Sequence, residues 1–150
     1  MTRKNIFIFD QNKCVACHAC IIACMNENGF QYDHWRNVHN SQSLHLPGLP
    51  LFYLSMACNH CDEAPCLKNC PANAYSRDKE TGGVIHNPKK CIGCKYCTWA
   101  CPYDAPKYVI EKGIIEKCNF CNQRIPEDIK PACAEMCPVA ALDFKQSDFS

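Results

Sequence analysis

Cysteine spacing constrains this chain more than any other feature. The 150 residues include 16 cysteines, above the roughly 8–10% that marks a cysteine-stabilised fold. Large apolar residues are too scarce for packing alone to secure a core, so cysteine chemistry must contribute. The cysteines form four groups, which are Cys14, Cys17, Cys20 and Cys24; Cys58, Cys61, Cys66 and Cys70; Cys91, Cys94, Cys97 and Cys101; and Cys118, Cys121, Cys133 and Cys137.

Several uses of these cysteines, and several partners, are disfavoured. The N-terminal residues 1–10 lack the apolar run of roughly 7–15 residues of a signal peptide. The most apolar stretch, residues 44–58, contains Pro47, Pro50 and His45, so no transmembrane helix is predicted. Because the cytosol keeps thiols reduced, metal ligation is favoured over disulfides. A formal net charge of +1 gives no basic footprint, so no nucleic-acid partner is expected.

The spacing C-x2-C-x2-C-x3-C occurs in groups one and three. Three thiolates at i, i+3 and i+6 can converge on one iron–sulfur cube, while the fourth lies on a short helical turn and points elsewhere. In paired-cluster ferredoxins the fourth cysteine ligates the other cluster, and a proline follows it. Pro71, Pro102 and Pro138 follow three of the groups, whereas Met25 follows group one. The pattern predicts four [4Fe-4S] clusters.

Group order along the chain predicts how the clusters are shared. Groups two and three are neighbours at a spacing usual for a two-cluster unit, so groups one and four must pair with each other. Crosswise ligation then predicts four cysteine quartets. They are Cys58, Cys61, Cys66 with Cys101; Cys91, Cys94, Cys97 with Cys70; Cys14, Cys17, Cys20 with Cys137; and Cys118, Cys121, Cys133 with Cys24.

Zinc sites and catalytic iron–sulfur clusters are the alternatives to four electron-transfer clusters. Zinc at all four groups, or a zinc ribbon at group four alone, is the alternative, but groups one and three have a third cysteine that a zinc knuckle does not need. Cluster enzymes that bind substrate leave one iron without a thiolate, and all 16 cysteines are used here. One-electron transfer is therefore the expected chemistry. We predict no catalytic residue and no direct small-molecule substrate.

The expected fold is α+β, with two ferredoxin-like modules nested in pseudo-twofold symmetry and held together by their clusters. Residues 46–105 would form the inner module, and residues 1–45 with 106–150 the outer one. Local signals predict a helix over 19–28 that ends at Gly29, two hairpins, and strands near each end of the chain. The predicted strands cover 5–10, 51–57, 74–77, 84–86, 108–111, 114–117 and 141–144.

The motifs resemble the four-cluster subunits of dimethyl sulfoxide reductase-type molybdopterin enzymes. The resemblance rests on Leu54-Ser55-Met56-Ala57-Cys58-Asn59-His60-Cys61, Ala64-Pro65-Cys66, Lys90-Cys91-Ile92-Gly93-Cys94-Lys95-Tyr96-Cys97, Ala100-Cys101-Pro102-Tyr103, Lys117-Cys118-Asn119-Phe120-Cys121, Lys130-Pro131-Ala132-Cys133 and Met136-Cys137-Pro138.

The resemblance covers about residues 5–145. It implies an electron-transfer subunit that docks on a catalytic subunit containing molybdenum or tungsten and often on a quinone-linked membrane anchor, and so is membrane-associated through its partners. Relatives of this kind serve anaerobic respiration. Cys94 stands where nitrate reductase relatives have Trp, so nitrate reductase is disfavoured. A free-standing soluble polyferredoxin is the alternative.

Lysines beside the motifs suggest how the clusters are tuned. We hypothesise that they offset cluster charge and raise reduction potentials, the alternative being that they are solvated loop residues. Trp99 is expected to be a packing residue, the alternative being that it shields a cluster from water. His18 and His60 are expected to be loop residues and not ligands, the alternative being that they make cluster potentials pH-dependent. The lysines are Lys13, Lys90, Lys95 and Lys117.

Overall fold

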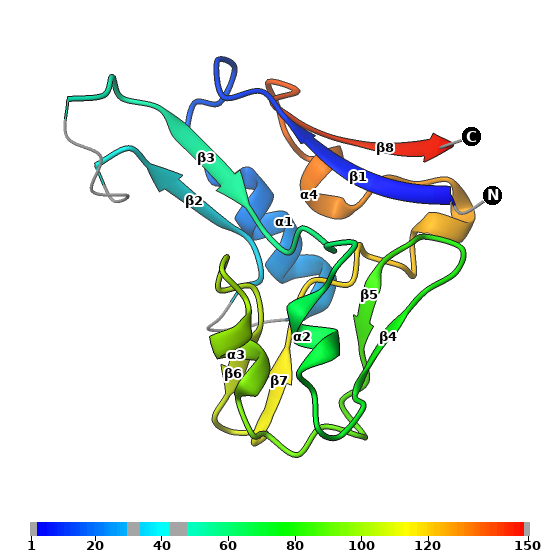
Figure 1. The fold of residues 1–150 in the computed structure, drawn as a ribbon. Coiled ribbons are helices and arrows are strands. Elements are labelled where there is room, and N and C mark those ends of the chain that lie inside the picture. Colours follow the sequence, from blue (N-terminus) through cyan, green and yellow to red (C-terminus); the bar gives the residue numbers. More distant parts are fainter. Residues whose placement is uncertain (1–2, 30–33, 43–47, 149–150) are drawn as a thin grey trace.

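The computed structural model describes residues 3–29, 34–42 and 48–148 of an α+β chain (Figure 1), as expected. Its elements are short. The strands are β1 Arg3–Phe9, β2 Asn37–Asn40, β3 Tyr53–Met56, β4 Tyr75–Arg77, β5 Val84–His86, β6 Lys107–Val109, β7 Ile114–Glu116 and β8 Leu142–Asp148. The helices are α1 Ala19–Asn28, α2 Pro65–Lys68, α3 Tyr96–Ala100 and α4 Ala132–Glu135, with the 3-10 turn η1 Ile125–Glu127.

The two ends of the chain meet in one antiparallel sheet. β1 pairs with β8 over its full length, and Phe7 lies opposite Phe144 (Figure 1). The ring centroids of Phe7 and Phe144 are 5.3 Å apart, and that of Phe120 lies 5.4 Å from each. This aromatic cluster fastens the terminal strands to the loop that carries Cys118 and Cys121, so apolar burial anchors that group to the end of the fold.

Three more two-stranded sheets complete the strands: β2 with β3, β4 with β5, and β6 with β7. The two hairpins predicted from Gly-containing turns, β4–β5 and β6–β7, are confirmed. The predicted strand at 51–57 is present but shorter, and the last strand runs further than 141–144. β2 and its pairing with β3 were not predicted. Short polar strands such as Asn37–Asn40 have little local signal, because their formation depends on the partner strand.

Proline determines helix length in this fold. α1 continues past Cys24 because Met25 follows it, and the helix ends with Gly29 in the left-handed conformation at φ 71°. In the other three groups a proline follows the last cysteine, and the chain turns at once. The same turn recurs there, with backbone N–H donors three residues on bonded to the carbonyls of Cys70, Cys101 and Cys137 at 3.3, 3.4 and 3.3 Å.

The helices pack in two pairs. α1 contacts α4 beneath the β1–β8 sheet, and α2 contacts α3 at the opposite end of the view (Figure 1). Ala57, Cys58, Ala105 and Cys118 form a further small buried cluster, which places Cys58 of group two close to Cys118 of group four. The predicted module boundary between residues 45 and 46 lies outside the described residues. Within the described part of the chain, no helix has the length and apolar character needed to cross a membrane.

Candidate metal centres

The cysteine loops are shaped by residues in the left-handed conformation. His18, between Cys17 and Cys20, has φ 61° and precedes α1, and Lys95, at the matching place in group three, has φ 64° and precedes α3. Each such residue turns the chain sharply from loop to helix. The third cysteine of the motif is thereby brought onto the first turn of the helix, facing the loop that carries the first two.

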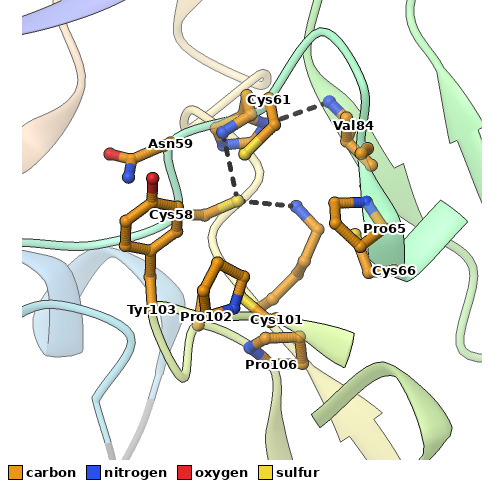
Figure 2. A pocket seen from close by; sticks show the side chains of 14 residues that line it. Cys58, Asn59, Cys61, Pro65, Cys66, Val84, Cys101, Pro102, Tyr103 and Pro106 are labelled. Atoms are coloured by element: carbon orange, nitrogen blue, oxygen red, sulfur yellow. Dashed lines mark hydrogen bonds between the residues drawn. The ribbon is translucent and has the colours of Figure 1, made fainter. Parts of the chain in front are cut away.

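Cys58, Cys61, Cys66 and Cys101 line one cavity (Figure 2). Cys66 lies on α2 and Cys101 directly follows α3, so the α2–α3 contact brings groups two and three together. Pro65, Pro102 and Pro106 also line the cavity. The lining also includes the polar side chains of Asn59 and Tyr103 and those of the buried Lys117 and His60.

A second cavity is lined by the remaining cysteines of groups two and three. These are Cys70, Cys91, Cys94 and Cys97. Gly93 in this loop has φ +69°, and a Cβ there would lie 2.2 Å from the Gly113 carbonyl oxygen. The tip of the β6–β7 hairpin can therefore close over the loop only because residue 93 is glycine.

A third cavity brings together the two ends of the chain. It is lined by Cys14, Cys17 and Cys20 of group one and by Cys137 of group four. Cys17 is exposed. The exposed side chains of Val15, Met136 and Val139 come from the same two segments, so this site lies at the surface.

The last four cysteines are all buried. They are Cys24, Cys118, Cys121 and Cys133. The α1–α4 contact brings Cys24 to Cys133, and the thiol of Cys121 lies within electrostatic range of both. Cys118 lies near Cys133 and also near Cys58 of the first cavity. This quartet is therefore in the interior, next to the quartet around Cys58.

Burial keeps several thiols neutral unless a metal is bound. It raises the pKa of Cys66 and of Cys121 to about 11 each, and that of Cys118 further. A coordinated metal removes the thiol proton, so metal loading at these sites releases protons. The thiols are thus poor nucleophiles without metal, and they are suited to holding it.

Backbone N–H groups point at several of the sulfur atoms. The amide of His60 lies 3.3 Å from Cys58 Sγ, that of Ala74 3.3 Å from Cys70 Sγ, and that of Gly93 3.4 Å from Cys91 Sγ. Such N–H donors stabilise thiolate more than thiol and help set cluster potentials.

Two cations are buried among the cysteines. Lys117 is 3% exposed and its ammonium lies 3.5 Å from Cys58 Sγ. Arg36 is 2% exposed and donates to Ser55 Oγ at 3.1 Å. Its Nε and one terminal nitrogen have no hydrogen-bond partner among the residues that the structure describes. Ser55 Oγ lies 3.4 Å from Cys20 Sγ. Buried cations need nearby negative charge, and thiolate-ligated clusters would supply it. The residues present fit iron–sulfur clusters.

His60 lies in a loop, as predicted, but the loop is an interior one. The residue is 1% exposed, its Nδ1 accepts the Val84 N–H at 2.9 Å, and its ring stacks on Phe120 at 3.6 Å. Burial, together with Lys117 and Arg77, holds the pKa of His60 well below its usual range, so the ring is neutral. No local signal indicates this burial, because it depends on a loop 60 residues away in the sequence.

Two further expectations are revised by the structure. Trp99 does not pack in the interior; it is 79% exposed and stacks on Tyr96 along α3. The four lysines are not equivalent, because Lys13, Lys90 and Lys95 are exposed whereas Lys117 is buried. Arg36, outside every cysteine motif, was not identified from the sequence at all.

Comparison with known proteins gives one family match and a consistent set of relatives. Residues 49–147 match the 4Fe-4S dicluster domain. The chain is similar to the B subunit of the anaerobic dimethyl sulfoxide reductase of Haemophilus influenzae, with 38% identity over 95% of this chain and 74% of the relative. It is 36% identical to the Escherichia coli protein of the same name, over 99% of this chain and 76% of the relative.

A third relative has a different named activity. The thiosulfate reductase electron transfer subunit of Salmonella typhi is 33% identical over all of this chain and 80% of its own length. All three relatives are named as reductase subunits, one of them as an electron-transfer subunit, and the reductase to which they belong differs.

Proposed function

Because the chain belongs to the 4Fe-4S dicluster family that includes the B subunits of anaerobic dimethyl sulfoxide reductases, we propose that it relays single electrons through four [4Fe-4S] clusters. The electrons pass between a molybdopterin catalytic subunit, with molybdenum or tungsten, and a quinone-linked membrane subunit or another carrier. The chain is the electron-transfer subunit and not the catalytic one. Bound clusters supply one-electron redox chemistry.

We propose the crosswise cysteine quartets as the ligand sets. The observation that carries this proposal is that three cavities are each lined by one complete quartet, with three cysteines from one group and the last cysteine of another. The fourth set has no such cavity described, and its support is the mutual proximity of the buried thiols. That set is Cys24, Cys118, Cys121 and Cys133.

The four quartets lie in a row in this proposal. Cys66 of one quartet lies on α2 and Cys70 of the next follows the end of that helix, while α1 carries both Cys20 and Cys24. Lys117 connects Cys58 to the Cys118 backbone. The row therefore runs from the Cys70 quartet through those of Cys58 and Cys24 to that of Cys17, and the two terminal quartets are the entry and exit points for electrons.

The nested modules, residues 46–105 within residues 1–45 and 106–150, follow from the same assignment. The β1–β8 pairing supports the outer module, since it joins the two ends of the chain. The α2–α3 contact supports the inner one. Exposed apolar side chains at one terminal quartet, Ile92, Tyr96 and Trp99, would be covered by a partner subunit. Association with a membrane would come through such partners.

Anaerobic native co-purification tests the proposal. We expect a large subunit containing molybdenum or tungsten and about 16 irons per copy of this chain. A brown, redox-active chain without partners would support the free-standing polyferredoxin instead. A colourless anaerobic preparation that contains zinc and no sulfide would overturn the iron–sulfur assignment.

A further inference from the structure

We propose that the buried Lys117 ammonium raises the reduction potential of the cluster held by Cys58, Cys61, Cys66 and Cys101. Lys117 would thereby stabilise an electron at the junction between the two halves of the row. The inference rests on the proposed function, because it requires a cluster at that quartet. It goes further by assigning the tuning of one cluster to one side chain.

The position of Lys117 is fixed by contacts from two quartets. Its Nζ donates to the Cys118 carbonyl oxygen at 2.8 Å and to Cys58 Sγ at 3.5 Å. The side chain begins at the end of β7, lies 59 residues from Cys58 in the sequence and is 3% exposed. Lys117 therefore places a cation against one ligand sulfur, at the point where the quartet of Cys118 begins.

Cys58 is also held by its own loop. The His60 N–H lies 3.3 Å from the same sulfur atom, and Figure 2 shows dashed lines meeting at the sulfur of Cys58. The His60 ring is fixed by the Val84 N–H and by stacking on Phe120, which belongs to the loop between Cys118 and Cys121. Two donors thus converge on Cys58, and only the one from Lys117 carries charge.

A charge in this position favours the reduced state. A cube with four thiolates carries about −2 when oxidised and about −3 when reduced, and hydrogen bonds to its sulfurs are a known determinant of potential. The attraction between the ammonium and the cluster therefore increases on reduction. Because Lys117 is buried, solvent and salt screen this attraction far less than they would at the surface.

Two other lysines at matching sequence positions allow the effect of a buried charge on cluster potential to be separated from that of an exposed one. Lys13 and Lys90 also directly precede the first cysteine of a group, but both are exposed. Water screens an exposed ammonium, so these lysines should have little influence on any potential. Sequence position is the same in the three cases, and Lys117 is distinguished by its burial and by its contact with Cys58 Sγ.

Potentiometric titration of the anaerobically loaded full chain, followed by electron paramagnetic resonance, tests the inference. Lys117→Met should lower one midpoint potential. The expected change is about tenfold in the oxidised-to-reduced ratio at a given poise, which is about 59 mV for a one-electron couple. Lys90→Met is the matched control and should leave all four midpoint potentials unchanged. Lys117→Arg keeps the positive charge and should leave the affected midpoint potential close to that of the parent chain.

Equal titrations for Lys117→Met and Lys90→Met, with four clusters present in both, would overturn the inference and leave the proposed function intact. Absence of clusters from the parent chain would overturn both. If Lys117→Met binds no cluster, the test is made on the parent chain labelled with ¹⁵N-lysine. Pulsed electron paramagnetic resonance should then detect a lysine nitrogen coupled to a reduced cluster. Absence of that coupling would contradict the inference.

Discussion

Two quartets share helix α1 and yet differ in exposure. Cys20, on its first turn, faces a surface cavity that includes the exposed Cys17, whereas Cys24, one turn later, faces the interior. Figure 1 shows α1 passing between the β1–β8 sheet with α4 and the rest of the chain. We refer to the surface quartet as Cys14, Cys17, Cys20 and Cys137, and to the interior quartet as Cys24, Cys118, Cys121 and Cys133.

Helix α1 therefore carries one cysteine of the surface quartet and one of the interior quartet, and the two quartets have different surroundings. In the proposed function, the surface quartet would exchange electrons with a partner, because little protein covers it. The interior quartet contributes to the core itself, since all four of its cysteines are buried and Cys133 packs in one buried cluster with Phe120 and strand β8. Loss of metal from the two sites should therefore have unequal consequences for the fold.

Replacement of one ligand in each quartet should give the largest contrast. Cys118→Ser removes a buried ligand, so the chain should lose the interior cluster and about 3–5 kcal/mol of stability. Cys17→Ser should perturb only the surface cluster and leave the remainder folded. Iron content and thermal unfolding of anaerobic samples measure both effects, and equal destabilisation by the two variants would remove the distinction.

Removal of metal from the parent chain should proceed in two phases. An anaerobic chelator should extract the surface cluster at least about tenfold faster than the interior one, because the interior site must first open by local unfolding. Iron release followed against time gives the two rates. The Cys17→Ser variant serves as the control, and its fast phase should release about four fewer irons than that of the parent. A single phase in the parent chain would be inconsistent with the structure.

An ion pair that covers the interior quartet should have a smaller effect. Glu27, near the end of α1, binds Arg124 at 3.0 Å and Gln123 at 3.2 Å, which ties α1 to the segment after Cys121. Glu27→Gln should cost about 1 kcal/mol and accelerate only the slow phase of iron release.

The matched control for this ion pair is Glu63→Gln. Glu63 pairs with Lys68 at an exposed site on α2, distant in sequence from the interior quartet. This substitution should leave both phases of iron release as they are in the parent. Acceleration of the slow phase by both variants would argue that general destabilisation, not the cover over the interior quartet, is responsible.

The weakest expected effect comes from the ion pair of Asp143 with Lys130, which joins β8 to the loop before α4. The Lys130 ammonium and the Phe144 N–H hold the pKa of Asp143 below its usual value of 3.8. The ion pair therefore stabilises the folded chain above pH 3.8, and this stabilisation is lost as the pH falls through the lowered pKa of Asp143.

Both side chains of this pair are well exposed, so salt screens them. Asp143→Asn should change the melting temperature only within error at physiological salt, and any difference at low salt should narrow as the pH falls below the usual Asp pKa value of 3.8. The variant should not alter either phase of iron release. A change in either phase would show that surface charge, and not burial alone, determines how fast the surface and interior quartets release iron.

Local chemistry explains which parts of this fold were predictable. The helix ending at Gly29 and the two Gly-containing hairpins follow from short-range turn signals, and proline after the last cysteine explains why three helices are short. Strand β2 and the burial of His60, Arg36 and Lys117 depend on segments far away in sequence. Such long-range contacts cannot be predicted from composition or cysteine spacing. The candidate ligands were therefore recognisable from the sequence, whereas the buried residues that surround them were not.

The central claim is that each cluster takes three cysteines from one group and the last cysteine of another. Diffraction at the iron absorption edge, from anaerobically grown crystals of the loaded chain, tests this most directly. We expect four compact groups of iron peaks, with the interior group among Cys24, Cys118, Cys121 and Cys133. Iron bound by all four cysteines of a single sequence group, or fewer than four iron sites, would contradict it.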